Sequence, residues 1–465
     1  MLEPALQHAR SQRREHLDRL CDWLRIPSIS TLPEHASDVL RAAQWVTDYL
    51  RRVGMERVEL IETAGHPIVY ADWLDVQGPT LLIYGHFDVQ PVEPLEEWRT
   101  LPFEPQLVGD DLLGRGTADD KGQVFAVLAA LEAYLKTSGR LPVMVKVCLE
   151  GEEEVLSPHL ASFLRERRQE LRADAILICD QEMLGPQAPL IVYGVRGNVY
   201  LELEVRGPAQ DLHSGTFGGA VDNPFNVLVR LLASLQDPQT RRVLIPGFYD
   251  RVRPLGEEER RLIAKAPLDD ALGLSLTGAP ALAGEEGFSL AERITVRPTL
   301  DIHGIRGGFT GEGGKTVIPA MATAKLSMRL VPDQEPEEIA RLCEAYLRKI
   351  APPTVTLEVR TIGTARPVII DYTAPPVRAA AQAYERGFGA SPVYFRGGGS
   401  LPILRDMIDV LSERSEPSRG EIPVVMMGFG LPDDNTHAPN EKLHLPNFYK
   451  GIETIIHYLE ILGKS

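Results

Sequence analysis

The sequence has few cysteines and no long apolar segment. Among its 465 residues only Cys21, Cys148, Cys179 and Cys343 are cysteines, and no two of them form a CxxC pair. This spacing argues against a disulfide framework and against a zinc ribbon. No apolar run reaches the ~18–20 residues that span a bilayer, and the first residues are polar and amphipathic, unlike the core of a signal peptide. We therefore predict a cytoplasmic protein that does not bind in a membrane.

The chain also lacks a surplus of basic residues. It has 49 Lys and Arg against 65 Asp and Glu, which gives a formal net charge of −16. A nucleic-acid-binding surface needs a basic face, so this balance argues against a nucleic-acid partner. Hydrophobic residues make up 44% and charged residues 25% of the chain, as in ordinary globular proteins. The acidic surplus fits a solvated surface, or carboxylates gathered for a chemical purpose.

The hydrophobic pattern of the first part of the chain predicts alternating helices and strands. Such alternation is typical of an α/β domain with a largely parallel sheet. The pattern returns after residue 375, with an apolar strand at 424–427 and a final helix after Pro446. In the first part, helices are predicted at 17–26, 39–53 and 123–135, and strands at 80–84, 143–149 and 175–179.

The middle of the chain has a different pattern, in which apolar and polar residues alternate as in strands with one exposed face. We therefore predict a discontinuous α/β catalytic domain, formed by 1–194 and 367–465, with an α+β domain inserted at 195–366. Asn223 is the predicted N-cap of the first helix of the inserted domain. The elements predicted there are strands at 199–206, 324–331 and 355–359 and helices at 224–235 and 336–350.

Histidine and acidic side chains gather where the predicted strands of the α/β domain end. In an open α/β sheet, ligands bind at the carboxyl ends of the strands, so these side chains are expected to converge. The residues are His86, Asp88, Asp119, Asp120, Glu153, Glu154, Asp180 and His437.

Such a convergence predicts a metal site, because several carboxylates at one edge repel each other unless a positive charge lies among them. Imidazoles and carboxylates without thiolates suit Zn²⁺ or Mn²⁺. Two ions ~3.5–4 Å apart need a bridging carboxylate, which the Asp119-Asp120 turn could supply. Asp88 lies two residues after His86 and could accept its second ring N–H.

Five motifs in the chain are jointly specific: YGHFDVQP (84–91), GRGTADDKG (114–122), DLHSGTFGG (211–219), RLVPDQ (329–334) and HAPNE (437–441). In this order they resemble the aminoacylase/carboxypeptidase/dipeptidase family of co-catalytic metallopeptidases. Within that family they look most like the branch of cytosolic nonspecific and carnosine dipeptidases. The resemblance implies a zinc-exopeptidase-like catalytic domain with two Zn²⁺ or Mn²⁺ ions per subunit. It also implies that the inserted domain acts as a lid and forms a homodimer.

The resemblance implies a role for each residue of the metal site. Glu153 matches the general base, and the Asp119–Asp120 peptide matches a bond that is cis in the family. Relatives often carry Gly-Ser where residues 155–157 stand here, which leaves Glu152 and Glu153 as an alternative base and ligand pair. The implied ligands are His86, Asp119 and Asp180 for one ion and Asp119, Glu154 and His437 for the other, with Asp88 as the partner of His86.

The resemblance also implies substrate-binding residues. His213 matches a histidine that reaches the partner subunit's active site and polarises the scissile carbonyl. Arg329 matches the residue that binds the free carboxylate of the substrate, where a bidentate guanidinium is favoured. Backbone N–H groups of Gly398, Gly399 and Ser400 could bind the same carboxylate.

Together these residues predict a metal-dependent dipeptidase, in which a Glu base activates a metal-bridged water. An N-acyl-amino-acid deacylase or a carboxypeptidase of the same family is the alternative, since each cleaves an amide beside a carboxylate. A metal-stabilised binding protein without catalysis is the alternative from another class.

Overall fold

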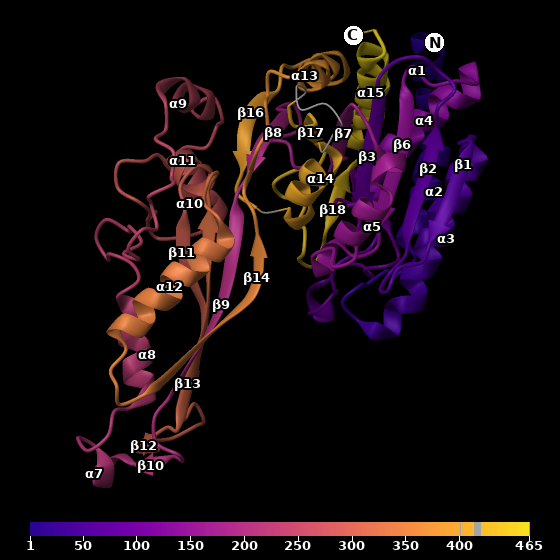
Figure 1. The fold of residues 1–465 in the computed structure, drawn as a ribbon. Helices are drawn as coiled ribbons and strands as arrows, with labels where there is room; N and C mark the ends of the chain where they lie inside the picture. Colours follow the sequence, from indigo (N-terminus) through magenta and orange to yellow (C-terminus); the bar gives the residue numbers. More distant parts are fainter. Residues whose placement is uncertain (400, 413–419, 465) are drawn as a thin grey trace. The chain divides into compact units, whose positions relative to one another are not determined.

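The α/β and α+β patterns of the sequence fall into two compact units of the computed structural model (Figure 1). No helix of the described chain has the length and apolar character needed to cross a membrane. The structure describes residues 1–399, 401–412 and 420–464. Unit 1 consists of Met1–Tyr193, Ile370–Phe395 and Asp406–Ser465, and unit 2 of Gly194–Ile369 and Arg396–Arg405.

Helices and strands alternate along unit 1 from residue 121 to residue 179, as the apolar pattern predicts. Its helices are α1 (Leu2–Ser11), α2 (Arg13–Leu24), η1 (Pro33–His35), α3 (Ala36–Val53), η2 (Leu95–Glu97), α4 (Lys121–Ser138), η3 (Glu153–Val155), α5 (Leu160–Glu166), α6 (Arg168–Leu171), α13 (Pro375–Phe388) and α15 (Leu445–Leu462). Its strands are β1 (Arg57–Ile61), β2 (Ile68–Trp73), β3 (Thr80–His86), β4 (Gln106–Val108), β5 (Asp111–Leu113), β6 (Met144–Glu150), β7 (Ala175–Cys179), β17 (Val424–Met427) and β18 (Lys442–His444). Strands β8 (Leu190–Val195) and β16 (Val393–Gly397) and helix α14 (Pro402–Ser412) lie where the chain passes between the units.

The large sheet has the order β1-β2-β6-β3-β7-β17-β8-β15, in which β15 is Val368–Ile369, and β16 also pairs with β8. Strands β6, β3, β7 and β17 are parallel neighbours, which confirms the predicted parallel sheet in its central part. The β1 and β2 strands continue the sheet as antiparallel neighbours. Because the central strands run in one direction, their carboxyl ends meet at one edge.

Helix α4 is the most buried element beside this sheet. Fourteen of its 18 residues are buried, and it packs against α1, α2, α3 and α15. A helix surrounded in this way needs apolar residues on all sides, which explains its nearly continuous apolar sequence. It begins at Lys121, directly after Asp120, so its burial fixes where the Asp119-Asp120 turn lies.

Unit 2 contains an antiparallel sheet with the order β11-β13-β9-β14. Helices α8 and α12 pack against it. The predicted N-cap is confirmed, because the Asn223 side chain accepts a hydrogen bond from the Phe225 N–H at 2.9 Å. The elements of unit 2 are β9 (Gly197–Arg206), β10 (Leu212–His213), α7 (Ser214–Phe217), α8 (Pro224–Ala233), α9 (Glu257–Ile263), α10 (Asp270–Thr277), α11 (Leu290–Thr295), β11 (Thr299–Gly307), β12 (Val317–Ile318), β13 (Met321–Leu330), α12 (Pro336–Ile350), β14 (Thr356–Ala365) and β15 (Val368–Ile369).

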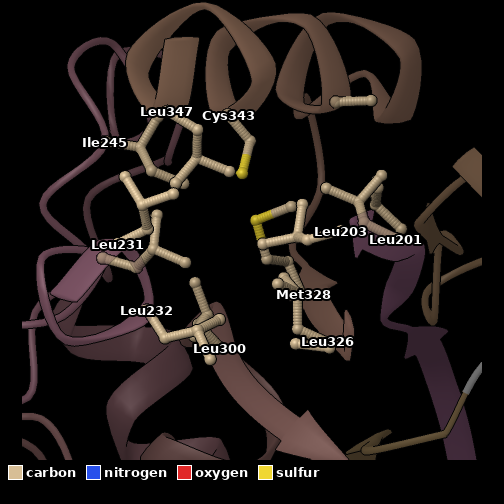
Figure 2. Close-up of a cluster of buried hydrophobic side chains, with 14 of the residues drawn as sticks. Leu201, Leu203, Leu231, Leu232, Ile245, Leu300, Leu326, Met328, Cys343 and Leu347 are labelled. Carbon is tan, nitrogen blue, oxygen red and sulfur yellow. The ribbon is translucent and has the colours of Figure 1, made fainter. Parts of the chain in front are cut away.

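The core of unit 2 lies between its sheet and its two long helices. Figure 2 shows side chains of β9 and β13 facing Leu231 of α8 and Leu347 of α12. Along β9, Val199, Leu201 and Leu203 are fully buried while the residues between them are partly exposed. This alternation gives the sheet one apolar face, which holds unit 2 together.

Shortening one of these core side chains is expected to destabilise unit 2. We expect Leu203→Ala to lower the free energy of unfolding by about 2–5 kcal/mol, because it leaves a cavity in a packed core. Leu276→Ala is the matched control, since Leu276 is 60% exposed, and it should change stability by less than about 0.5 kcal/mol. Urea denaturation followed by far-ultraviolet circular dichroism measures both, and equal midpoints for the two variants would contradict the assigned core.

Candidate metal centre

The carboxyl ends of the parallel strands bring the predicted ligands together. His86 is the last residue of β3, Asp180 directly follows β7, and Glu154 lies in η3 after β6. Asp119 lies in the turn before α4, and His437 lies in the loop between β17 and β18. Their ligand atoms form two groups, each within 4.8 Å: His86, Asp119 and Asp180, and Asp119, Glu154 and His437.

Asp119 belongs to both groups. Its Oδ1 lies 3.0 Å from His86 Nε2, and its Oδ2 lies 2.8 Å from His437 Nε2. Glu154 Oε2 lies 3.3 Å from the same nitrogen of His437. The Asp119–Asp120 peptide bond is cis, as the resemblance implies. Because its two oxygens face different histidines, Asp119 has the arrangement of a bridging carboxylate.

The electrostatics are those of carboxylates crowded around two imidazoles. Hydrogen bonds with Asp119 and Glu154 raise the pKa of His437 to about 10. Burial opposes ionisation of Asp119, but His437 and His86 outweigh it and lower the pKa of this carboxyl. Burial, with Asp119 nearby, raises the pKa of Asp180 well above its ordinary value. Cations bound among these carboxylates would stabilise their ionised forms.

The donor atoms of the two groups fit divalent ions. Glu154 Oε1 is buried and has no hydrogen-bond partner among the described residues, and the buried His86 Nε2 makes no hydrogen bond of good geometry although Asp119 Oδ1 lies 3.0 Å away. Buried polar atoms are normally satisfied, so an imidazole nitrogen and a carboxylate oxygen that both lack a well-aligned hydrogen bond suit a metal ion. Imidazole and carboxylate donors without thiolates are typical of zinc and manganese sites.

Asp88 positions the turn that carries Glu153 and Glu154. Its Oδ1 accepts the N–H of Glu153 at 3.3 Å, and its Oδ2 accepts the N–H of Glu154 at 3.1 Å. His86 Nδ1 is hydrogen-bonded to the backbone oxygen of Asp88 at 3.1 Å. The same nitrogen lies 3.3 Å from the Asp88 carboxylate. The Asp88 carboxylate thus lies near the second ring nitrogen of His86, but the backbone oxygen of Asp88 makes the hydrogen bond.

Glu153 lies next to both groups without belonging to either. Burial raises the pKa of Glu153 to about 8; His86 opposes the shift, while Glu154 and Asp119 add to it. A carboxyl group with a pKa near neutrality can both take up and release a proton during a reaction.

Glu152 has different partners. His159 Nδ1 lies 2.8 Å from Glu152 Oε2, and the N–H of His66 donates to Glu152 Oε1 at 3.1 Å. The sequence suggests no partner for either histidine: His66 lies 86 residues from Glu152 in the chain, and His159 lies seven residues after it outside any recognised motif. Of the two glutamates that follow Glu152, only Glu154 belongs to a ligand group.

The predicted substrate-binding residues lie in unit 2, except that Ser400 is outside the described residues. His213 ends β10, and its Nδ1 accepts the N–H of Gly215 at 2.9 Å. Arg329 is partly exposed on β13 between two buried residues, so it lies on the polar face of the sheet. Gly398 and Gly399 follow β16.

Arg196 holds the loop of Gly398 and Gly399, which the sequence does not reveal. Its Nε donates to the Gly398 carbonyl at 2.9 Å, and its backbone N–H donates to the Gly399 carbonyl at 3.1 Å. Burial lowers the pKa of Arg196 to about 10, and the charge of Arg329 adds to this shift. The nearest signal in the sequence is an arginine directly after the apolar run at 190–195.

A protein-family model matches most of this chain. The model of peptidase family M20/M25/M40 matches residues 82–461, a range that includes every residue of the two ligand groups. The chain belongs to this family.

Members of the family with full-length similarity include dipeptidases and a carboxypeptidase. The Cys-Gly metallodipeptidase of Candida albicans is 31% identical over 100% of this chain and 98% of that protein. The crystal structure of human carnosine dipeptidase 1 has a TM-score of 0.85 and 30% identity, covering 100% of this chain and 99% of that one. An M20 family metallo-carboxypeptidase from Sulfolobus solfataricus has a TM-score of 0.86 and 33% identity, covering 97% of this chain and 100% of that one.

Proposed function

We propose that this peptidase is a metal-dependent dipeptidase that hydrolyses the amide bond of dipeptides. The observation that supports it best is the pair of ligand groups joined through Asp119, with Glu153 beside them. Full-length similarity to a Cys-Gly metallodipeptidase and to a carnosine dipeptidase favours dipeptides as the substrate class.

In this proposal the site holds two divalent ions, Zn²⁺ or Mn²⁺. His86, Asp119 and Asp180 would hold one ion, and Asp119, Glu154 and His437 the other. When bound, such ions polarise a carbonyl and make water more acidic. Asp88 keeps Glu153 and Glu154 in place through their backbone N–H groups, so it acts as a positioning residue.

Glu153 is the proposed general base. It takes a proton from the attacking water and returns it to the leaving amine, which its raised pKa permits. The contacts of Glu152 with His159 and His66 favour Glu153 and Glu154, over Glu152 and Glu153, as the base and ligand pair.

Unit 2 supplies substrate recognition in the same proposal. Arg329 binds the free carboxylate of the dipeptide, and His213 of the partner subunit polarises the scissile carbonyl. Gly398, Gly399 and Ser400 offer backbone N–H groups to the substrate carboxylate. Unit 2 would then act as a lid and would also form the interface of a homodimer. Four cysteines without a disulfide are consistent with a cytoplasmic location.

Removing the Arg329 guanidinium is expected to weaken binding of the substrate carboxylate. We expect Arg329→Gln to lower kcat/KM for a dipeptide about 10- to 150-fold, the range for a lost hydrogen bond to a charged group. For the same dipeptide with an amidated C-terminus, wild type and variant should differ little. Steady-state kinetics on both substrates checks this, and equal losses on the two would contradict the assignment.

A carboxypeptidase is the second candidate, because the solved Sulfolobus relative is described as one. A substrate panel separates it from a dipeptidase and from a deacylase. Dipeptides with a free amine should be cleaved fastest, ahead of N-acetyl amino acids and N-acetylated dipeptides. Preference for the N-acetylated dipeptides would favour the carboxypeptidase, and preference for N-acetyl amino acids would favour the deacylase.

A further inference from the structure

A buried ion pair joins the turn that carries Asp119 to the segment that carries His437. Arg115 Nη1 lies 2.7 Å from Glu441 Oε2, and the two side chains are 1% and 0% exposed. Neither residue belongs to a ligand group, and the proposed reaction uses neither. Buried ion pairs often add little to stability, so stability alone does not explain why a pair of charges is buried here.

The Glu441 carboxylate binds the backbone of the turn before α4. Its Oε1 accepts the N–H groups of Ala118 at 2.9 Å and Asp119 at 3.1 Å. Its Oε2 accepts the N–H of Gly116 at 3.1 Å in addition to the Arg115 guanidinium. The carboxylate therefore accepts four hydrogen bonds, which matches its lone pairs.

Arg115 is itself held from two sides. Its Nη2 donates to the Pro91 carbonyl at 2.9 Å, and its guanidinium lies 5.4 Å from the centre of the Trp98 ring. Its backbone N–H donates to the Pro102 carbonyl at 2.8 Å. The guanidinium thus gives Glu441 a fixed counter-charge, which a buried carboxylate requires.

We infer that Glu441 is a positioning residue for the metal centre, with Arg115 as its fixed partner. By holding the Asp119 N–H, Glu441 sets the backbone from which the two Asp119 oxygens face His86 and His437. Glu441 lies four residues after His437, so the same short segment supplies one ligand and orients the bridging one. The inference rests on the proposed two-metal function and adds a residue to it.

The test replaces one oxygen of Glu441 by an NH₂ group. In Glu441→Gln, this group faces either the Ala118 and Asp119 N–H groups or Gly116 and Arg115, so donors meet donors. We expect the affinity of the metal-depleted full chain for Mn²⁺ to fall about 10- to 100-fold, as is typical when a partner of a ligand is lost. Competition with a chromophoric chelator measures the affinity. Electron paramagnetic resonance at two Mn²⁺ per chain should show two magnetically coupled ions in wild type. In the variant the coupling between the two ions should be weaker.

Glu132→Gln is the matched control. Glu132 is also buried and accepts hydrogen bonds from Arg19 and the Tyr49 hydroxyl, but it touches no residue of the ligand groups. We expect it to lower the thermal midpoint while Mn²⁺ affinity stays within about twofold of wild type. Arg115→Lys is the second test variant, and it should weaken Mn²⁺ binding less than Glu441→Gln because a positive charge remains.

Wild-type affinity in Glu441→Gln would overturn the inference, and so would an equal loss of affinity in Glu132→Gln. If Glu441→Gln does not fold, unchanged Mn²⁺ affinity in Arg115→Lys overturns it. These outcomes leave the proposed function in place. A wild-type chain that binds no divalent ion would overturn the proposed function together with the inference.

Discussion

In the Glu153→Gln variant, kcat is expected to fall by about 10²–10⁴-fold, which is the usual contribution of a general base. The amide has nearly the shape of the carboxylate but cannot take a proton from water. Glu153 belongs to neither ligand group, so the variant should still bind two metal ions per chain. Steady-state kinetics on a dipeptide and the metal content of the dialysed protein measure the two effects.

Glu152→Gln is the control for this variant. Glu152 is the neighbouring carboxylate, with His159 and the His66 N–H as its partners. It should keep most of the activity. Full activity in Glu153→Gln would contradict the assignment of the base, and loss of activity only in Glu152→Gln would favour the alternative pair.

The Asp119→Asn variant is expected to lose the metal centre as a whole. A neutral amide cannot bridge two cations as a carboxylate does, and Asp119 is the only residue shared by the two ligand groups of the described chain. We expect kcat/KM to fall at least ~10³-fold, or ~4 kcal/mol of transition-state stabilisation. Metal content should fall below that of any variant outside the ligand groups, as inductively coupled plasma mass spectrometry can measure.

Asp433→Asn is the matched control for the bridging position. Its side chain is 75% exposed and pairs with Lys442 at 3.2 Å. Exposed pairs of this kind contribute about 0–1 kcal/mol, so activity and metal content should stay near wild type. Retention of two ions and of activity in Asp119→Asn would rule out a bridging role.

The central strands could be predicted from the sequence because buried parallel strands are continuous apolar runs. The predicted strands at 175–179 and 424–427 have the bounds of β7 and β17. β3 begins at the predicted residue 80 and continues to His86. The meeting of histidines and carboxylates at one edge follows from this arrangement, whereas the role of each ligand came from the resemblance to a family.

Other features depend on contacts that no local pattern contains. β2 is not among the predicted strands; in the structure its Asp72 is buried and accepts a hydrogen bond from the Tyr70 hydroxyl at 2.9 Å. The carboxylate of Asp88 binds the N–H groups of Glu153 and Glu154, which lie 65 and 66 residues away in the chain. The sequence around His86 does not indicate these two contacts. The short helices α9 and α10 bury a single residue each, so they lack an apolar face that would mark them.

The four hydrogen bonds of Glu441 could not be predicted from the sequence either. The residue stands in the motif HAPNE, but its sequence neighbours do not indicate that it binds a turn more than 300 residues earlier. Only the folded chain brings the segments of Asp119 and His437 together.

The most direct test is a metal titration of the metal-depleted full chain in which bound Mn²⁺ or Zn²⁺ and dipeptide hydrolysis are measured on the same samples. If the chain is a two-metal dipeptidase, hydrolysis should be absent in the metal-free protein and should reach its maximum when two ions are bound per chain. Full hydrolysis without metal, or two bound ions with no hydrolysis of any dipeptide, would contradict this account.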